Sequence, residues 1–200
     1  MSVDTDSVPE DDHLRRGYDL LEEGDLDGAI QEFAEAAVLT DLVENGEIAD
    51  LQAALRDKSR FTSPQLVEGL ACAAVRGSVP AVDALLMAGA DPNGVGTRGS
   101  APLICAIESG DAEVVERIVR AGADVNRPDK VGNLPLIWAI DYEVDTADQC
   151  REELQCNISR KLIELGADPS LRGAEGEDAV QFARQRKHAL FLDMIANLHS

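Results

Sequence analysis

The side chains that most often bind zinc or act as nucleophiles are few in this chain of 200 residues, which has four cysteines and three histidines. They are Cys72, Cys105, Cys150, Cys156, His13, His188 and His199. No two cysteines form a C-x-x-C pair, and no histidine has an obvious nucleophile beside it in the sequence. The spacing therefore predicts no metal, no cofactor and no enzymatic activity.

Acidic residues also gather between Asp141 and Glu153, where Arg151 is the only basic residue. Clustered carboxylates can bind a cation, but this run lacks the central glycine of a calcium-binding loop. Two interpretations remain open for it: a solvated acidic loop, or an element that contacts a partner.

The charge balance narrows the choice of partner. The formal net charge is −20, from 38 acidic and 18 basic residues, so direct binding to nucleic acid or to an anionic membrane is disfavoured. A basic protein would be attracted, although acidic residues can also serve only solubility. The chain shows no apolar run of the roughly 20 residues that span a bilayer, and its first residues do not resemble a signal peptide. We expect a cytoplasmic monomer with reduced cysteines.

The elements that position these side chains follow from a repeat. Ala101-Pro102-Leu103 recurs 33 residues later as Leu134-Pro135-Leu136, and the segment 89–93 (GADPN) recurs 33 residues later as 122–126 (GADVN). A third copy, 166–170 (GADPS), arrives after 44 residues, so its unit carries an insertion of 11. A shared period in several independent segments indicates a repeat architecture.

Each unit has the pattern of two short helices. Pro102 suits a first helical turn, and Leu103 and Ala106 share one face of that helix. Gly110 ends the first helix, and an apolar stripe beginning at Val114 predicts a second helix that ends at Gly122.

These motifs closely resemble the ankyrin repeat, whose units read T-P-L-H-x-A-A-x-x-G-H, then an apolar helix, then G-A-D-V-N; residues 101–133 are the best copy. The resemblance implies an all-α solenoid of stacked helix-turn-helix units with short hairpin connections, which binds other proteins rather than catalysing a reaction. Ala101 and Leu134 replace the family's capping threonine, and the loss of such a cap costs about 1 kcal/mol.

The resemblance divides the chain into units. Lys187 stands in the closing unit where a glycine is expected. The predicted units are an opening cap at 37–67, repeats at 68–100, 101–133 and 134–177 (with the insertion at about 142–155), and a closing cap at 178–200. The insertion either lengthens the helices of its unit or forms a loop between them.

The residues before the repeats differ in kind. Residues 13–36 resemble a single tetratricopeptide helical hairpin, and one such unit cannot bury its own apolar face. We expect it to pack on the first ankyrin unit. Residues 1–12 are acidic and poor in apolar residues, which predicts a disordered tail.

Cys72 and Cys105 occupy equivalent places in adjacent repeats, and Trp138 and Phe182 occupy that place in the next two units. Each precedes the small alanine of its first helix. A cysteine there is expected to be a small core residue rather than a nucleophile.

In the ankyrin family partners usually meet the concave face, which the repeat tips and the first helices form. Tyr142 is the strongest single candidate there because aromatic residues dominate binding hot spots, unless it packs beneath the insertion. The predicted partner-binding residues are Arg76, Thr97, Arg98, Ser100, Glu108, Ser109, Lys130, Val131, Asn133, Asp141, Tyr142, Glu175, Glu177, Gln185 and Arg186.

Two functions fit these features. The first is a non-enzymatic adaptor or regulatory binder that recognises one protein with the concave face. The alternative is an acidic inhibitor, such as an immunity protein that neutralises a basic toxin or nuclease. Only the second should associate much more slowly at high salt.

Overall fold

The computed structural model describes residues 37–57, 60–96, 99, 101–150 and 153–198. The predicted tail at 1–12 and the predicted hairpin at 13–36 lie outside the described residues, as do three predicted partner-binding residues, Thr97, Arg98 and Ser100. Those predictions remain predictions.

The described chain is helical. It begins with helical residues 37–44, and no strand occurs in its described part, where Arg172 and Asp178 form an isolated bridge. The helices that follow are α3 (Ile48–Ala54), α4 (Ser63–Val75), α5 (Val79–Ala88), α6 (Pro102–Ser109), α7 (Ala112–Arg120), α8 (Pro135–Cys150), α9 (Asn157–Glu164), α10 (Ala179–Gln185) and α11 (Ala189–Leu198). None of the helices described is long and apolar enough to cross a membrane.

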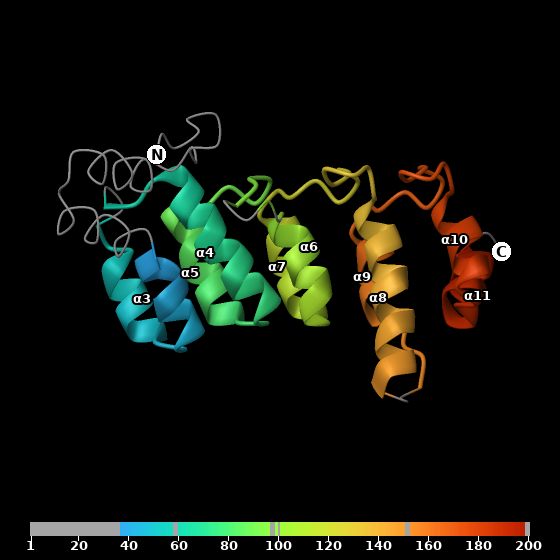
Figure 1. Cartoon of the computed structure of the whole chain (residues 1–200), viewed down its shortest axis with the longest axis horizontal. Coiled ribbons are helices and arrows are strands. Elements are labelled where there is room, and N and C mark those ends of the chain that lie inside the picture. The colour runs from blue at the N-terminus through green and yellow to red at the C-terminus, as the bar shows by residue number, and fades with distance from the viewer. Residues whose placement is uncertain (1–36, 58–59, 97–98, 100, 151–152, 199–200) are drawn as a thin grey trace, which may run out of the picture.

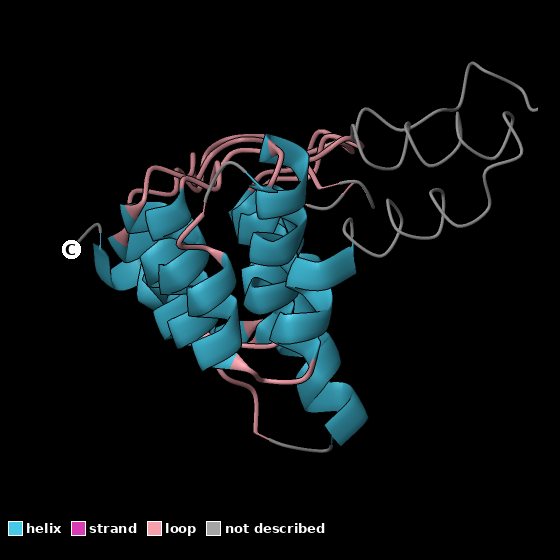
Figure 2. Ribbon diagram, turned by 90° about the vertical axis from the view of Figure 1, so that its left-hand side faces the viewer, coloured by secondary structure: helices cyan, strands magenta, loops and turns pink. Residues whose placement is uncertain are grey.

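The helices form two rows. In the first row α4, α6, α8 and α10 contact one another in that order, and in the second row α3, α5, α7, α9 and α11 do the same. Figure 1 shows the helix pairs side by side along one axis, and Figure 2 shows the two rows with the connections crossing above them. The expected solenoid of helix-turn-helix units is confirmed.

The core runs between the rows as repeated layers. Leu70, Leu103 and Leu136, which the repeat places at equivalent positions, are 0%, 4% and 3% exposed and belong to one buried cluster. The alanines three residues further on, Ala73, Ala106 and Ala139, are fully buried. Small side chains there let neighbouring helices approach closely, so a core of alanine, leucine, valine and isoleucine suffices.

Turns between paired helices use left-handed backbone. Gly110 has φ +73° between α6 and α7, and Lys187 has φ +59° at the equivalent place between α10 and α11. The closing unit therefore keeps the turn of the other units although its residue carries a side chain.

The connections are tied together by an asparagine of each unit. The Asn93 side chain accepts from the N–H of Asp124 (2.8 Å) and donates to the carbonyl of Gly122 (2.8 Å). Asn126 makes the same two bonds to Asp168 (2.8 Å) and Gly166 (3.2 Å) of the next unit. The G-A-D-x-N motif thus links each unit to its successor.

The first-row helices differ in how they begin. Thr62 caps α4 in a capping box with Gln65, so α4 starts at Ser63, five residues before the expected start of its repeat at 68. Helix α6 starts at Pro102, and Ala101 gives it no side-chain cap, as the missing threonine predicted.

The insertion lengthens one helix of its unit. Helix α8 has 16 residues against 8 in α6, while α9 has 8, so the extra residues extend the first-row helix and the return to α9. Figure 1 shows the end of α8 projecting beyond the other helices.

A buried carboxylate fixes this extension to its neighbours. Glu143 of α8, 4% exposed, accepts at Oε1 from the N–H groups of Ile158 (2.8 Å) and Ser159 (3.0 Å), the first turn of α9. Its Oε2 lies 2.9 Å from Nε2 of the fully buried His188, whose Nδ1 accepts from the N–H of Phe191. A ring whose Nδ1 accepts can donate from Nε2, here to the Glu143 carboxylate. One carboxylate thereby joins α8, α9 and the start of α11.

Candidate functional site

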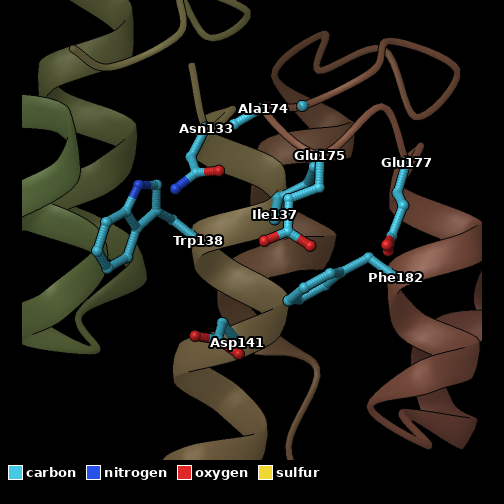
Figure 3. Close-up of a pocket in the computed structure, with 9 residues that line it drawn as sticks. Asn133, Ile137, Trp138, Asp141, Ala174, Glu175, Glu177 and Phe182 are labelled. Atoms are coloured by element: carbon cyan, nitrogen blue, oxygen red, sulfur yellow. The ribbon is translucent and has the colours of Figure 1, made fainter. Parts of the chain in front are cut away.

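A groove opens on the first-row side, where α8 and α10 meet the tips of the connections. We call it the aromatic groove; its volume is about 190 Å³. It is lined by Asn133, Ile137, Trp138, Asp141, Gly173, Ala174, Glu175, Glu177 and Phe182 (Figure 3). Helix α8 supplies one wall, α10 the other, and the tips at 133 and 173–177 form the upper rim.

Two half-buried aromatic rings stand on the two helices. In Figure 3 the Trp138 indole and the Phe182 ring lie on opposite sides of Ile137. The indole Nε1–H of Trp138 donates to Asp129 Oδ2 (2.8 Å). The other oxygen of Asp129 accepts from the N–H groups of Val131 (2.9 Å) and Asn133 (2.8 Å) at the tip. Asp129 therefore holds the tip and the indole in one arrangement.

The groove is shaped by a glycine at its upper end. A Cβ on Gly173 would lie 2.6 Å from Cδ1 of Ile137, so the absence of a side chain lets the tip approach the floor. An alanine there would require the end of the Ile137 side chain or the tip itself to shift.

The lower end of the groove carries a carboxylate that already has a partner. Asp141 lies 2.9 Å from Nε of Arg186, which also pairs with Asp145. Burial raises the pKa of Asp141, Arg186 opposes that rise, and the charge of Asp145 adds to it. Arg186 is thus neutralised by two carboxylates of α8.

The rim carries two carboxylates of another kind. Glu175 and Glu177 form no ion pair with the residues that the structure describes. Glu175 is exposed, whereas Oε2 of Glu177 is buried and has no hydrogen-bond partner. Figure 3 shows both carboxylates directed from the tip toward the level of Phe182. A buried acceptor without a donor is unfavourable, and a donor brought by a ligand would relieve it.

The structure brings together part of the predicted surface. Asn133, Asp141, Glu175 and Glu177 line the groove, and Arg186 borders it through Asp141. Val131 is 70% exposed at its tip. Lys130 lines a neighbouring hollow under the tips of the two preceding units.

Other predicted residues lie apart from the groove. Arg76 is the C-cap residue of α4, and its guanidinium lies 3.7 Å from the Glu44 carboxylate. Glu108 and Gln185 are exposed at the C-terminal ends of α6 and α10. The Ser109 hydroxyl donates to the carbonyl of Ala106 (2.7 Å) and so closes the end of α6.

Tyr142, the strongest single candidate, is half-buried against the core and does not line the aromatic groove. A Cβ on Gly110 would lie 2.4 Å from its hydroxyl, and it shares a separate hollow with Glu143, Thr146 and Glu153. Tyr142 therefore packs beside the turn between α6 and α7, and its role in partner binding stays a prediction.

Sequence reasoning missed Trp138 and Phe182 as groove residues, because their position in the repeat suggested core. Cys105 is indeed buried there, but Cys72 is half-buried and the two aromatic residues form walls. The change from cysteine to aromatic residues at one repeat position was the available signal.

No group of described residues could hold a metal ion. His188 and Glu143, the buried histidine and carboxylate, are occupied by hydrogen bonds to each other and to the backbone.

A stack of paired helices with a hollowed first-row face and projecting tips defines a helical repeat protein of the ankyrin class. A family model of ankyrin repeats matches residues 70–173 in three copies, and the chain therefore belongs to the ankyrin-repeat family. Ankyrin repeats are generally protein–protein interaction modules, and the family is typically non-enzymatic. A search of curated protein sequences finds no match to this chain.

Proposed function

We propose that the protein is a non-enzymatic adaptor or regulatory binder that recognises one other protein with its first-row face, centred on the aromatic groove. The observation that carries this proposal is the pair of half-exposed rings, Trp138 and Phe182, in a concave site under the tips. Interface hot spots are enriched in tryptophan, and they lie in pockets that become fully desolvated when the partner binds. We also propose a cytoplasmic location, where the four cysteines, none of which forms a disulfide in the described structure, would stay reduced.

Crosslinking from two opposite surfaces tests the proposal. A photo-reactive amino acid is placed at the exposed Ala174 in the groove or, as the control, at Met87, which is 71% exposed on the second-row helix α5. In cells that produce the protein, we expect one protein to crosslink strongly from position 174 and not from 87. The same crosslinks from both positions, or none from 174, would contradict the proposal.

Truncating the hot-spot candidate provides the energetic test. Trp138→Ala should weaken binding to the crosslinked protein by about 2 kcal/mol or more, a factor of roughly 30. Glu47→Ala, a change at an exposed residue before the second-row helix α3, should leave the affinity within about twofold.

The negative charge of the protein and of the groove rim favours the alternative, an acidic inhibitor of a basic toxin or nuclease. The rim carboxylates Glu175 and Glu177 have no ion-pair partner among the described residues, and the net charge is −20. Such an inhibitor should associate at least tenfold more slowly when salt rises from about 0.05 to 0.5 M. A rate that changes little with salt favours the adaptor.

A further inference from the structure

We infer that the aromatic groove receives an arginine side chain of the partner, with its guanidinium between the ring of Phe182 and the carboxylates of Glu175 and Glu177. This inference rests on the proposed function, because it names the chemical group that the same groove recognises.

The charges around the groove are unbalanced. The lower carboxylate of the groove, Asp141, is already paired with Arg186, and Asp145 completes the neutralisation of that arginine. No such partner faces Glu175 or Glu177 within the described structure. The rim therefore presents net negative charge to whatever enters.

One carboxylate oxygen at the rim lacks a hydrogen-bond donor within the described part of the chain. Oε2 of Glu177 is buried, yet no donor of the described residues reaches it. Such an atom loses water without gaining a hydrogen bond. An entering N–H donor, together with a small rotation of the Glu177 side chain, would supply that bond.

The groove has an apolar lining beneath the carboxylates. Ile137 and Phe182 form the floor and one wall, and Trp138 lies on the other side. A guanidinium is weakly hydrated, stacks on aromatic faces and donates in a fork to carboxylates, whereas an ammonium is a strongly hydrated point charge. An aromatic ring together with the two carboxylates of Glu175 and Glu177 thus favours arginine over lysine.

The single tryptophan of the chain gives a direct readout, because Trp138 lies in the groove itself. The full-length protein is titrated with three blocked tripeptides whose central residue is arginine, lysine or citrulline, the neutral isostere of arginine. We expect a saturable change of Trp138 emission with the arginine peptide and at least tenfold weaker binding of the citrulline peptide. Lysine should fall between them.

Matched variants locate the contact. Glu175→Gln and Glu177→Gln should each weaken binding of the arginine peptide about tenfold, and Glu47→Gln, at an exposed residue before the second-row helix α3, should not change it. Since Glu175 is exposed, its substitution tests the rim even where Glu177→Gln perturbs folding. Three results would each overturn the inference. The arginine peptide binds no more tightly than the citrulline or the lysine peptide, Trp138 emission shows no saturable change, or Glu175→Gln leaves the affinity for the arginine peptide unchanged.

The outcome separates this inference from the proposed function. If Trp138→Ala weakens binding of the protein crosslinked from Ala174 but Glu175→Gln and Glu177→Gln leave that affinity unchanged, the groove binds a protein without recognising arginine. If the arginine peptide binds as expected but no protein crosslinks from Ala174, the proposed function fails while the chemistry of the groove stands.

Discussion

Four equivalent positions of the first-row helices hold Cys72, Cys105, Trp138 and Phe182, each followed by a fully buried alanine. A cysteine there fits against the neighbouring helix, as Cys105 does. An aromatic ring is too large to be enclosed at the same place, so Trp138 and Phe182 remain half-exposed and wall the groove. A larger side chain at this one position of the repeat therefore forms a wall of the groove instead of a buried packing contact.

Lys187 carries a left-handed turn that glycine would adopt without strain. Lys187→Gly should raise the free energy of unfolding by about 0.5–1 kcal/mol, as measured by urea denaturation. Lys187→Ala is the matched control and should give no such gain, because alanine keeps the Cβ that causes the strain. Equal effects of the two changes would show that backbone strain is not the cause.

The two cysteines beside the insertion should differ in reactivity. Cys150 is exposed, whereas burial raises the pKa of the Cys156 thiol, which also contacts the Ser159 hydroxyl (3.2 Å). Because the thiolate is the reactive species, alkylation at pH 8 should modify Cys150 much faster than Cys156. Mass spectrometry after pulse labelling checks this order, and in urea the two rates should converge.

At the scale of elements, the extension of α8 is stabilised by a carboxylate rather than by apolar packing alone. Glu143 accepts two N–H groups of α9 and one from His188. Glu143 follows Asp141, at the end of the groove wall, by two residues. Its hydrogen bonds therefore also hold the part of α8 that lines the groove.

Removing that carboxylate leaves three buried donors without an acceptor. Glu143→Ala should therefore lower the free energy of unfolding by about 3 kcal/mol or more. Asp148→Ala, a change at an exposed acid of the same helix, should stay within about 0.5 kcal/mol. Thermal and urea unfolding measure the free energy of unfolding of both variants. Similar values would show that the hydrogen bonds of Glu143 do not contribute to stability.

Helix α6 begins without a side-chain cap although Ala101 has the extended backbone that a capping residue needs. Ala101→Thr should add about 1 kcal/mol to the free energy of unfolding by capping the free N–H groups. Ala101→Val has nearly the same shape without the hydroxyl and should not stabilise. The difference between the two in urea denaturation isolates the cap from packing.

At the scale of the whole molecule, stability should depend on the number of neighbours of each unit, since a repeat array is held by its interfaces. Helix α7 packs between α5 and α9, whereas α11, also of the second row, contacts α9 alone in that row. Amide hydrogens of α11 should exchange faster than those of α7. Mass spectrometry after deuterium labelling checks this gradient, and uniform protection would instead show that the array unfolds as one unit.

The period, the paired helices and their glycine turns could be predicted from the sequence because each depends on nearby residues. Pro102 begins α6, Gly110 takes a left-handed turn and Leu70, Leu103 and Leu136 share the core, as expected. The lost cap at Ala101 could likewise be deduced from its side chain alone.

Tertiary structure decided the site. The aromatic groove combines α8, α10 and the tips around 133 and 175, and which side chains face one another there depends on how the helices turn as they stack. For this reason Tyr142 lies against Gly110 and outside the groove although it shares α8 with Trp138, and Glu143 reaches His188 across 45 positions. Local patterns determine which helices form, whereas a concave surface exists only after separate units have packed against each other.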